Sequence, residues 1–338
     1  MILDKLRDQT FLEKLGIVDW SYTNQLEPVS FERYDKWVKR EDHGVLHYLS
    51  DHRREARRSL NSVLPECKSA LIFLFTYHPQ KRALEEVYKN NQWNGLKLGS
   101  YVLGFNGVDY HYEVKGRLSS IGEALKESVD GLDYAHALDV HPVLERDLAF
   151  RSGLGWFGKN SMMISKEYGS YTILGTLLLN KELKLEERNR EVDHCGQCRA
   201  CVDACPTDAI DIEARSIKAN QCISTFTIEL FKDAPAPKGM EHSNGEFFGC
   251  DICQEVCPWN KRPIRLDRVK SVAPAEFLKE NELVINHFLL KPIEKIQEDL
   301  EQTSNNKFAK TYKFTPLGRT GRKGLLKNIK FWKSVKKS

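Results

Sequence analysis

The sequence predicts an α+β domain followed by a cysteine-rich module and a short helical C-terminal region. Three observations support this fold class. Residues 70–77 (ALIFLFTY) have the apolar and aromatic content of a buried central strand. Residues 109–129 place apolar side chains along one face of a helix. Eight of the nine cysteines lie within the 63 residues from Cys195 to Cys257, which indicates a compact module of its own.

The local patterns also predict the elements in order. Pro142 fits the start of a helix, and Tyr168, Gly169 and Ser170 fit a turn between two strands. The expected elements are mostly helical residues 1–65, a central strand at 70–77, an irregular stretch at 79–108, a helix at 109–129, a short strand at 134–139, a helix at 143–151, a glycine-rich turn at 152–160, and a hairpin of 162–165 with 171–179.

A charged segment separates the first domain from the cysteine module. Residues 181–192 (KELKLEERNREV) lack an apolar periodicity and are typical of a linker. We therefore expect three parts: an α+β domain at 1–185, a cysteine-rich domain at 186–265 and a helical basic region at 266–338.

The composition excludes several classes of protein. The chain has 338 residues, of which 41% are hydrophobic and 29% charged, and its mean hydropathy is −0.49. No run approaches the roughly 20 apolar residues of a membrane helix, and the charged N-terminus lacks the pattern of a signal peptide. We expect a cytoplasmic protein, in which thiols stay reduced. Nine cysteines in that compartment indicate metal ligation or redox chemistry rather than disulfides.

The charge is unevenly distributed, although the net charge is only +4. Residues 304–338 contain eleven Lys or Arg residues and no Asp or Glu. Such a tail attracts polyanions through counterion release. It is equally typical of a solvated, frayed C-terminus, so both interpretations stay open at this point.

The cysteine spacing carries the most specific chemistry. The run Cys195-x2-Cys198-x2-Cys201-x3-Cys205-Pro is the spacing of bacterial ferredoxins, in which three thiolates hold one cubane and the fourth reaches the other cluster. A second run is Cys250-x2-Cys253-x3-Cys257-Pro. A complete copy would need a cysteine at position 247, which is Phe247, and Cys222 is left to supply the missing ligand.

The eight clustered cysteines match the number of ligands that two [4Fe–4S] clusters need, with four thiolates for each cluster. We assign one cluster to Cys195, Cys198, Cys201 and Cys257, and the other to Cys205, Cys222, Cys250 and Cys253. Zinc sites prefer separated C-x2-C pairs, so three thiols at x2-x2 spacing disfavour zinc. Cys67 stands alone before the central strand and is expected to be a core thiol.

Two other patterns fail as cofactor motifs. Gly153-x-Gly155-x-x-Gly158 follows a predicted helix and precedes a strand, whereas a dinucleotide fingerprint follows a strand and opens a helix. Asp139-x-His141 begins the D-x-H-x-x-G pattern of some corrinoid proteins, but Leu144 occupies the glycine position.

Four segments resemble the epoxyqueuosine reductase family, in the family's order and over roughly residues 40–330. They are VDYHYEVKGRL (108–118), LDVHPVLERDLAFRSGLGWFGKNSMMI (138–164), CISTFTIEL (222–230) and FFGCDICQEVCPWNK (247–261). The resemblance implies a nitroreductase-like cobalamin-binding domain before a ferredoxin-like module with two clusters. It also implies reduction of epoxyqueuosine to queuosine at the wobble position of tRNA, the last step of queuosine biosynthesis. Base-off cobalamin and an external low-potential electron donor would take part, and we expect a monomer.

The resemblance also suggests site residues. It makes Asp139 the proton donor, kept protonated by shielding from water, whereas local pattern alone favours a helix N-cap. It places Arg57, Asp251 and the turn residues Lys159, Asn160 and Ser161 at the cofactor. Without it, Arg57 and Asp251 would be solvated charges and the others ordinary turn residues. Tyr110-His111 matches the family's D-Y-H, although His111 could equally be an ordinary helix residue.

Two departures and two alternatives remain. His141 stands where the family usually has a small residue, and the chain stops before the C-terminal repeat extension that helps many members hold tRNA, a task the basic tail could share. The alternatives are a reductive dehalogenase-like enzyme acting on a small molecule, and a non-catalytic electron carrier. The dehalogenases often carry an export signal, which we do not find here, and a carrier would not need the segments around Asp139.

Overall fold

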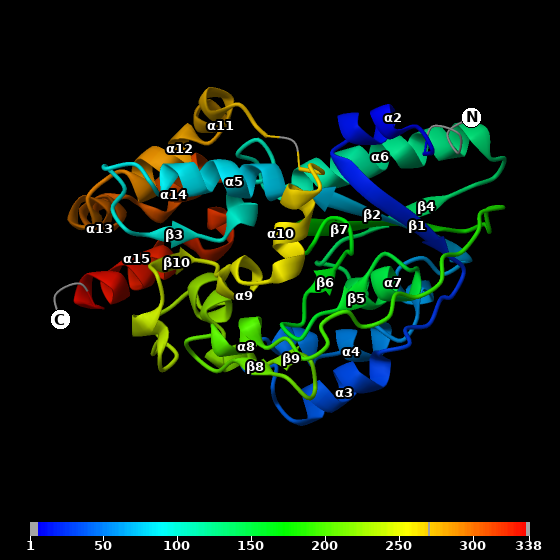
Figure 1. The fold of residues 1–338 in the computed structure, drawn as a ribbon, viewed down its shortest axis with the longest axis horizontal. Coiled ribbons are helices and arrows are strands. Elements are labelled where there is room, and N and C mark those ends of the chain that lie inside the picture. Colours follow the sequence, from blue (N-terminus) through cyan, green and yellow to red (C-terminus); the bar gives the residue numbers. More distant parts are fainter. Residues whose placement is uncertain (1–5, 270, 336–338) are drawn as a thin grey trace.

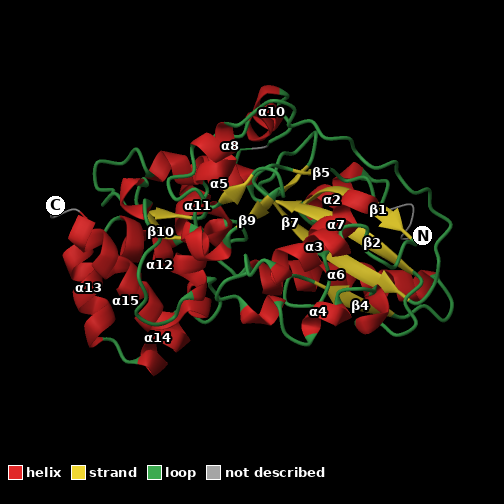
Figure 2. Cartoon of the chain, turned by 90° about the horizontal axis from the view of Figure 1, so that it is seen from below, coloured by secondary structure: helices red, strands yellow, loops and turns green. Residues whose placement is uncertain are grey.

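The computed structural model describes residues 6–269 and 271–335. It has two halves side by side, one built on a four-stranded sheet and the other made mostly of helices (Figure 1). The second view separates them again, with the strands of the sheet on one side and α13, α14 and α15 on the other (Figure 2). The cysteine-rich segment lies where the halves meet.

The sheet has the order β1-β2-β7-β4, and all neighbouring strands are antiparallel. Its strands are β1 (Ile17–Thr23), β2 (Ser69–Thr76), β4 (Tyr134–Ala137) and β7 (Thr172–Leu179). Around it lie α2 (Gln9–Lys14), α3 (Phe31–Lys39), α4 (Arg53–Ala56), α6 (Tyr110–Ser128), α7 (Glu145–Arg151) and the small pair β5 (Trp156–Phe157) and β6 (Met163–Ile164).

Strand β2 explains why this half folds as it does. Leu71, Phe73 and Phe75 pack in the cluster that contains the apolar stripe of α6, and Ile72 and Leu74 pack in the cluster that contains α7. Both faces are therefore covered, which accounts for the continuous apolar run in the sequence. Cys67 is buried beside this strand, as expected of a core thiol.

Three local predictions are wrong. The strand β1 lies within residues predicted to be mostly helical, and the helix α5 (His78–Val87) lies within the stretch predicted to be irregular. The predicted hairpin of 162–165 with 171–179 does not form, because β6 pairs with β5 while β7 pairs with β2 and β4. Only an isolated bridge from Ser165 to Gly169 remains at the turn.

The helical half has its own buried core. It gathers α5, β3 (Lys97–Leu98), β10 (Glu246–Phe248) and the C-terminal helices around aromatic side chains such as Phe247 and Phe288, whose ring centroids are 5.3 Å apart. Its further helices are α11 (Pro274–Glu280), α12 (Glu282–Val284), α13 (Ile293–Gln302), α14 (Asn305–Thr311) and α15 (Leu317–Val335). The cysteine-rich segment between the halves contains α8 (Ala200–Asp203), β8 (Ile210–Asp211), β9 (Ser216–Ile217), α9 (Ile252–Glu255) and α10 (Pro258–Arg265).

The basic C-terminal stretch is folded as far as residue 335. Leu325, Ile329 and Trp332 of α15 are buried in the core of the helical half. The Asn328 amide donates to the carbonyl oxygens of Thr227 and Phe247. The interpretation as a frayed tail is therefore wrong for the described part of this stretch.

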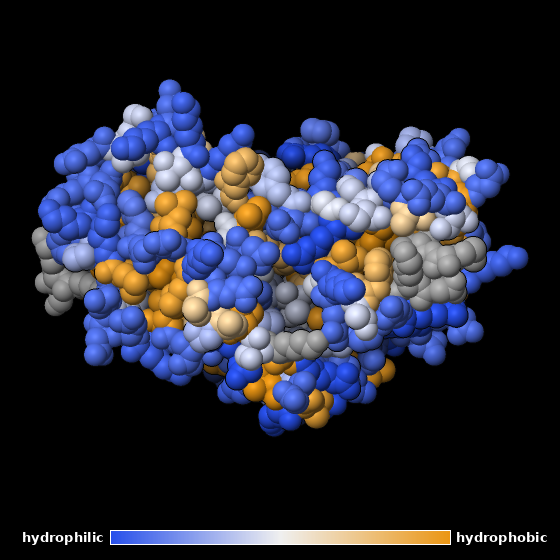
Figure 3. All heavy atoms as spheres, turned by 90° about the horizontal axis from the view of Figure 1, so that it is seen from above, coloured by the Kyte–Doolittle hydropathy of each residue, from blue (hydrophilic) through white to orange (hydrophobic). Residues whose placement is uncertain are grey.

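The outer surface agrees with the low mean hydropathy. The face shown in Figure 3 is mostly hydrophilic, with hydrophobic atoms in separate patches. Within the described residues, no helix has the length and apolar character needed to cross a membrane.

Candidate active site

The eight clustered thiols fall into two groups. We call Cys195, Cys198, Cys201 and Cys257 the outer thiols, and Cys205, Cys222, Cys250 and Cys253 the inner thiols. Burial and the neighbouring outer thiols raise the pKa of Cys201 to about 11. Burial raises the pKa of Cys253, and Cys222, Asp251, the outer thiol Cys201 and Cys205 add to this effect in that order. The fold thus brings together the same two sets that the spacing predicts, while their role as ligands stays a prediction.

A [4Fe–4S] cluster and a single metal ion place different demands on four thiolates. A cubane holds its four thiolates farther apart than a single zinc ion does, since each thiolate binds a different iron. Among the described residues, no three His, Cys, Asp or Glu side chains are close enough to bind one metal ion.

Aromatic side chains surround the outer thiols. The indole Nε1 of Trp156 donates to Cys195 Sγ at 3.4 Å, and the rings of Trp156, Trp259 and His194 pack against one another. Cys198 is exposed. The outer group is therefore close to solvent on one side and supported by aromatic rings on the other.

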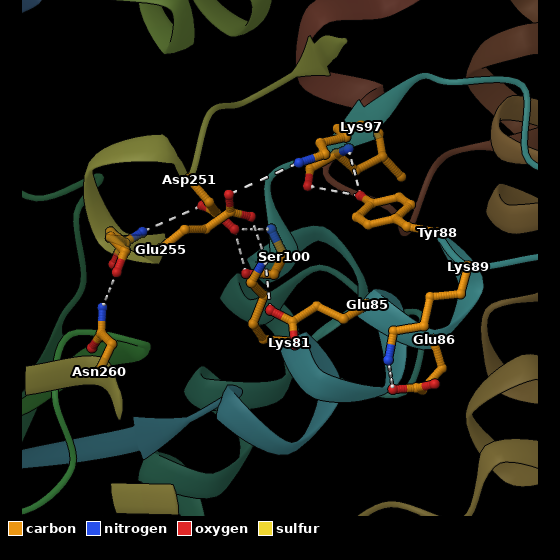
Figure 4. A network of polar contacts seen from close by, with 12 residues as sticks. Lys81, Glu85, Glu86, Tyr88, Lys89, Lys97, Ser100, Asp251, Glu255 and Asn260 are labelled. Atoms are coloured by element: carbon orange, nitrogen blue, oxygen red, sulfur yellow. Dashed lines mark hydrogen bonds and ion pairs between the residues drawn. The ribbon is translucent and has the colours of Figure 1, made fainter. Parts of the chain in front are cut away.

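A polar network lies beside the inner thiols (Figure 4). Asp251, which follows Cys250, is buried and accepts hydrogen bonds from the backbone N–H and hydroxyl of Ser100 at 2.8 and 2.5 Å. Lys81 donates to Glu255 at 2.5 Å. Burial raises the pKa of Asp251, whereas the charges of Asp251 and Glu255 outweigh burial and raise the pKa of Lys81. The interpretation of Asp251 as a solvated carboxylate is therefore wrong.

Two adjoining cavities lie between the sheet and the cysteine module. The larger has a volume of about 890 Å³ and is lined by six arginines together with aromatic side chains. The smaller has a volume of about 340 Å³ and reaches the inner thiol Cys250. The residues that line both are Tyr101, Tyr110, Asp139, Glu145 and Arg146. These five side chains mark the junction of the cavities.

Asp139 lies at this junction, on the loop between β4 and α7. Its carboxylate accepts hydrogen bonds from the Tyr110 hydroxyl at 2.5 Å and from His111 Nε2 at 2.7 Å. His111 Nδ1 lies 2.7 Å from Asp109, which caps the N-terminus of α6. The helix start thus orients two side chains onto the loop carboxylate.

The electrostatics of this triad correct the expectation of a protonated Asp139. Burial favours the neutral carboxyl, but hydrogen bonds and the charge of His111 outweigh it and lower the pKa of Asp139. Burial also opposes the charge on His111, yet the two carboxylates raise the pKa of His111 to about 10. The proton near neutral pH therefore rests on His111, hydrogen-bonded to the Asp139 carboxylate. The alternative of an N-cap is wrong, because no side chain caps α7.

A second carboxyl at the junction has the opposite character. Burial and the charge of Asp139 raise the pKa of Glu145 well above its usual range, and Glu145 Oε1 is a buried atom with no hydrogen-bond partner among the described residues. The junction thus combines a carboxyl whose pKa is lowered, Asp139, with one whose pKa is raised, Glu145.

Comparison with known proteins identifies the family. The profile of the 4Fe-4S double cluster binding domain matches residues 194–260. The epoxyqueuosine reductase of Cyclobacterium marinum is 31% identical over 335 residues, which cover 98% of this chain and 96% of that protein. The chain belongs to the epoxyqueuosine reductase family. The Escherichia coli epoxyqueuosine reductase is also 31% identical, over 94% of this chain and 76% of that protein.

Solved epoxyqueuosine reductase structures share the fold. The one from Streptococcus thermophilus gives a TM-score of 0.72 at 24% identity and covers 96% of this chain and 79% of that one. Another, with an epoxyqueuosine-modified tRNA stem loop, gives a TM-score of 0.70 at 24% identity and covers 97% and 80%. The mixed helix and sheet architecture is thus that of epoxyqueuosine reductases.

The residues that the family resemblance suggested for cofactor binding lie in different places. Arg57 is 6% exposed and lines the larger cavity, so it is not a solvated helix charge. Ser161 lines the same cavity, and its carbonyl and hydroxyl accept from Arg146. Lys159 instead donates to the carbonyls of Gly196 and Cys198 at 2.6 and 2.9 Å.

The other two predicted contacts lie nearer the inner thiols. The Asn160 amide donates to the Cys253 carbonyl at 3.4 Å, and neither Asn160 nor Lys159 lines either cavity. Asp251 lines the smaller cavity. Their assignment as cofactor contacts stays a prediction, and for Lys159 and Asn160 the structure shows contacts with the cysteine loops.

Sequence reasoning missed several residues of the site. Asp109 and Glu145 were not singled out, although Asp109 begins a D-x-H pattern at a helix start, which is a readable signal. Trp156 lies in the predicted glycine-rich turn, but the sequence assigned it no role of its own.

His141, the departure from the family pattern, lines the larger cavity. Its Nδ1 lies 3.2 Å from the Leu138 backbone carbonyl oxygen.

Proposed function

We propose that this protein reduces the epoxide of epoxyqueuosine to queuosine in tRNA. One observation carries the proposal: the ionised Asp139 and protonated His111 lie at the junction of two cavities, and one cavity reaches the inner thiol Cys250. Opening an epoxide needs both electrons and protons, because the oxygen that leaves carbon carries negative charge until it is protonated. The junction is placed to receive both.

The thiol groups would hold two [4Fe–4S] clusters, as their number and membership require. The outer cluster would accept electrons from an external donor, because Cys198 is exposed. The inner cluster would pass them toward the cavities, because Cys250 lines the smaller one. The two Cys-Pro ends cross between the groups, which keeps the clusters close together.

The larger cavity fits cobalamin by its size and by an unpaired donor. Arg57 Nη1 is a buried atom with no hydrogen-bond partner among the described residues, and Arg57 and Ser161 both line this cavity. These residues would contact the cofactor's polar groups. Cobalamin supplies a cobalt centre that is a strong nucleophile when reduced.

The proton path follows from the hydrogen bonds. His111 holds a proton at Nε2, which points at Asp139 Oδ1. Transfer through Asp139 delivers it to an oxygen of the substrate at the cavity junction, and Asp109 stabilises the imidazolium until then. Asp139 would therefore act as a relay rather than as a stored acid. Glu145, kept neutral by burial, would remain a neutral neighbour.

The test is turnover of tRNA that carries epoxyqueuosine, by protein loaded with iron, sulfide and cobalamin and supplied with a strong reductant. We expect Asp139→Asn to lower turnover by about 10²–10⁴-fold, because an amide cannot relay a proton. Iron content should not change. The control is Asp133→Asn, an exposed aspartate that directly precedes β4, at the end of the strand away from Asp139. No conversion by the loaded wild-type protein would refute the proposed function.

A further inference from the structure

Two exposed aromatic rings belong to residues whose neighbours in the chain line the larger cavity. Tyr112 and Phe314 are 53% and 54% exposed, and their ring centroids are 5.5 Å apart at an interplanar angle of 73°. Tyr112 belongs to the first turn of α6, and Phe314 to the turn between α14 and α15. Large aromatic side chains that are exposed together, rather than singly, indicate a contact surface.

The pair is fixed relative to the proton path. The backbone N–H of Asp109 donates to the carbonyl of Phe314 at 2.6 Å, and the same Asp109 bonds His111 through its side chain. Two and five residues after Phe314, Pro316 and Arg319 line the larger cavity. The rings therefore stand at a fixed place just outside the site where the substrate must react.

Lysines lie beside Phe314 and before it in the chain. The ammonium of Lys313 lies 5.0 Å from the centroid of the Phe314 ring. Lys307 and Lys310 are exposed on α14, one turn apart, and the described residues 304–335 contain no carboxylate side chain. Exposed aromatic rings among cations are the combination that binds unpaired nucleotides, since each base offers a face for stacking and each phosphate a negative charge.

We propose that Tyr112 and Phe314 form a stacking platform for unpaired nucleotides next to the modified nucleoside in the tRNA anticodon loop. This inference rests on the proposed function. To react inside the cavity, the modified base must leave the stack of its neighbours. The neighbouring bases then lose a stacking partner, and the platform at the cavity entrance replaces it. Lys313 and the lysines of α14 contact the phosphates.

The test measures binding and turnover separately. The probes are an unmodified anticodon stem-loop RNA and a hairpin of the same length whose longer stem is closed by a compact, stable tetraloop, both titrated by fluorescence anisotropy against the complete, cluster-loaded protein. We expect Phe314→Ala to weaken stem-loop binding about tenfold and to leave hairpin binding unchanged. Phe314→Trp should retain wild-type affinity. Lys313→Gln should slightly weaken the binding of both RNAs. It should also lower the slope of log affinity against log salt concentration by about 1.

The kinetics of turnover distinguish a stacking platform from residues that only stabilise the fold. Loss of the platform raises KM for epoxyqueuosine-containing tRNA about tenfold with unchanged kcat. A fall in kcat at unchanged KM would overturn the inference. The inference would also be wrong if the double variant Tyr112→Ala with Phe314→Ala bound the stem-loop within about twofold of the wild-type affinity. Leu283→Ala, an exposed residue of α12, is the control. A wild-type protein that binds the loop through these rings but leaves the epoxide intact would refute only the proposed function.

Discussion

The outer and inner thiols differ most in what surrounds them. The outer group includes the exposed Cys198 and rests on Trp156, whereas no inner thiol is exposed and Cys250 lines a cavity. A buried centre exchanges electrons poorly with an external protein, and an exposed one cannot exclude water from a reactive site. If the two groups hold clusters as proposed, this difference would divide the work: the outer cluster would receive electrons and the inner would deliver them.

Removing one thiol from each group gives the largest contrast. We expect Cys222→Ser to abolish turnover and to lower the iron content by about half, because the inner set needs four thiolates. Cys198→Ser should also lose about half of the iron, yet keep part of its turnover with a small chemical reductant that can reach the inner cluster. Iron analysis and electron paramagnetic resonance of the reduced protein measure both variants.

Cys67→Ser is the matched control, since Cys67 is a thiol buried outside both groups. Its iron content should equal that of the wild type. Equal turnover of the Cys222→Ser and Cys198→Ser variants under the same reductant would contradict the division of work between the two groups.

A smaller effect tests the protonation of His111, at the junction of the two cavities. Asp109→Asn removes one of the two carboxylates that raise the pKa of His111 to about 10. His111 is charged below its pKa and loses the proton as pH rises through it. We therefore expect the high-pH fall in turnover, near pH 10 in the wild type, to move toward neutral by about 1–3 units.

The measurement is kcat against pH. Glu113→Gln is the control, because this carboxylate lies on the same helix but pairs with Arg117. A profile of Asp109→Asn that coincides with the wild-type profile would rule out His111 as the proton store.

The smallest effect is expected on the outer side. Lys159→Met removes hydrogen bonds to the carbonyls of Gly196 and Cys198, which hold the loop of the outer thiols. We expect the outer cluster to lose iron about threefold faster in air, with little change in kcat. Spectra recorded over time follow this loss. Lys166 is exposed, and Lys166→Met should lose iron at the wild-type rate. If Lys159→Met lost iron faster from the inner cluster than from the outer one, the contacts of Lys159 would not act on the loop of the outer thiols.

The sequence predicted those features that depend on local spacing. The cysteine intervals alone grouped the thiols into the two sets that the fold brings together. The helix α6 was predicted within one residue at each end, because Asp109 is an N-cap and its apolar positions repeat every three to four residues. These signals are complete within a short window of the chain.

Features set by distant partners could not be predicted. Strand β7 pairs with β2, about a hundred residues earlier, so the nearby β6 was assigned the wrong partner. The ionised state of Asp139 depends on His111 from another element, and the motif alone suggested the opposite protonation. Periodicity and spacing carry no information on which buried groups will meet.

The packing of α15 has a consequence for how the protein is made. The side chains of Asn328 and Trp332 donate to the backbone carbonyls of Thr227, Phe247 and Glu246, which lie in the segments that carry the inner cysteines. During translation those cysteines emerge between about 65 and 110 residues before α15, which begins at Leu317. The packing around these segments is therefore completed only after α15 has left the ribosome. If the inner thiols hold a cluster as proposed, it would either be inserted after this helix has folded or enter a segment that is still open.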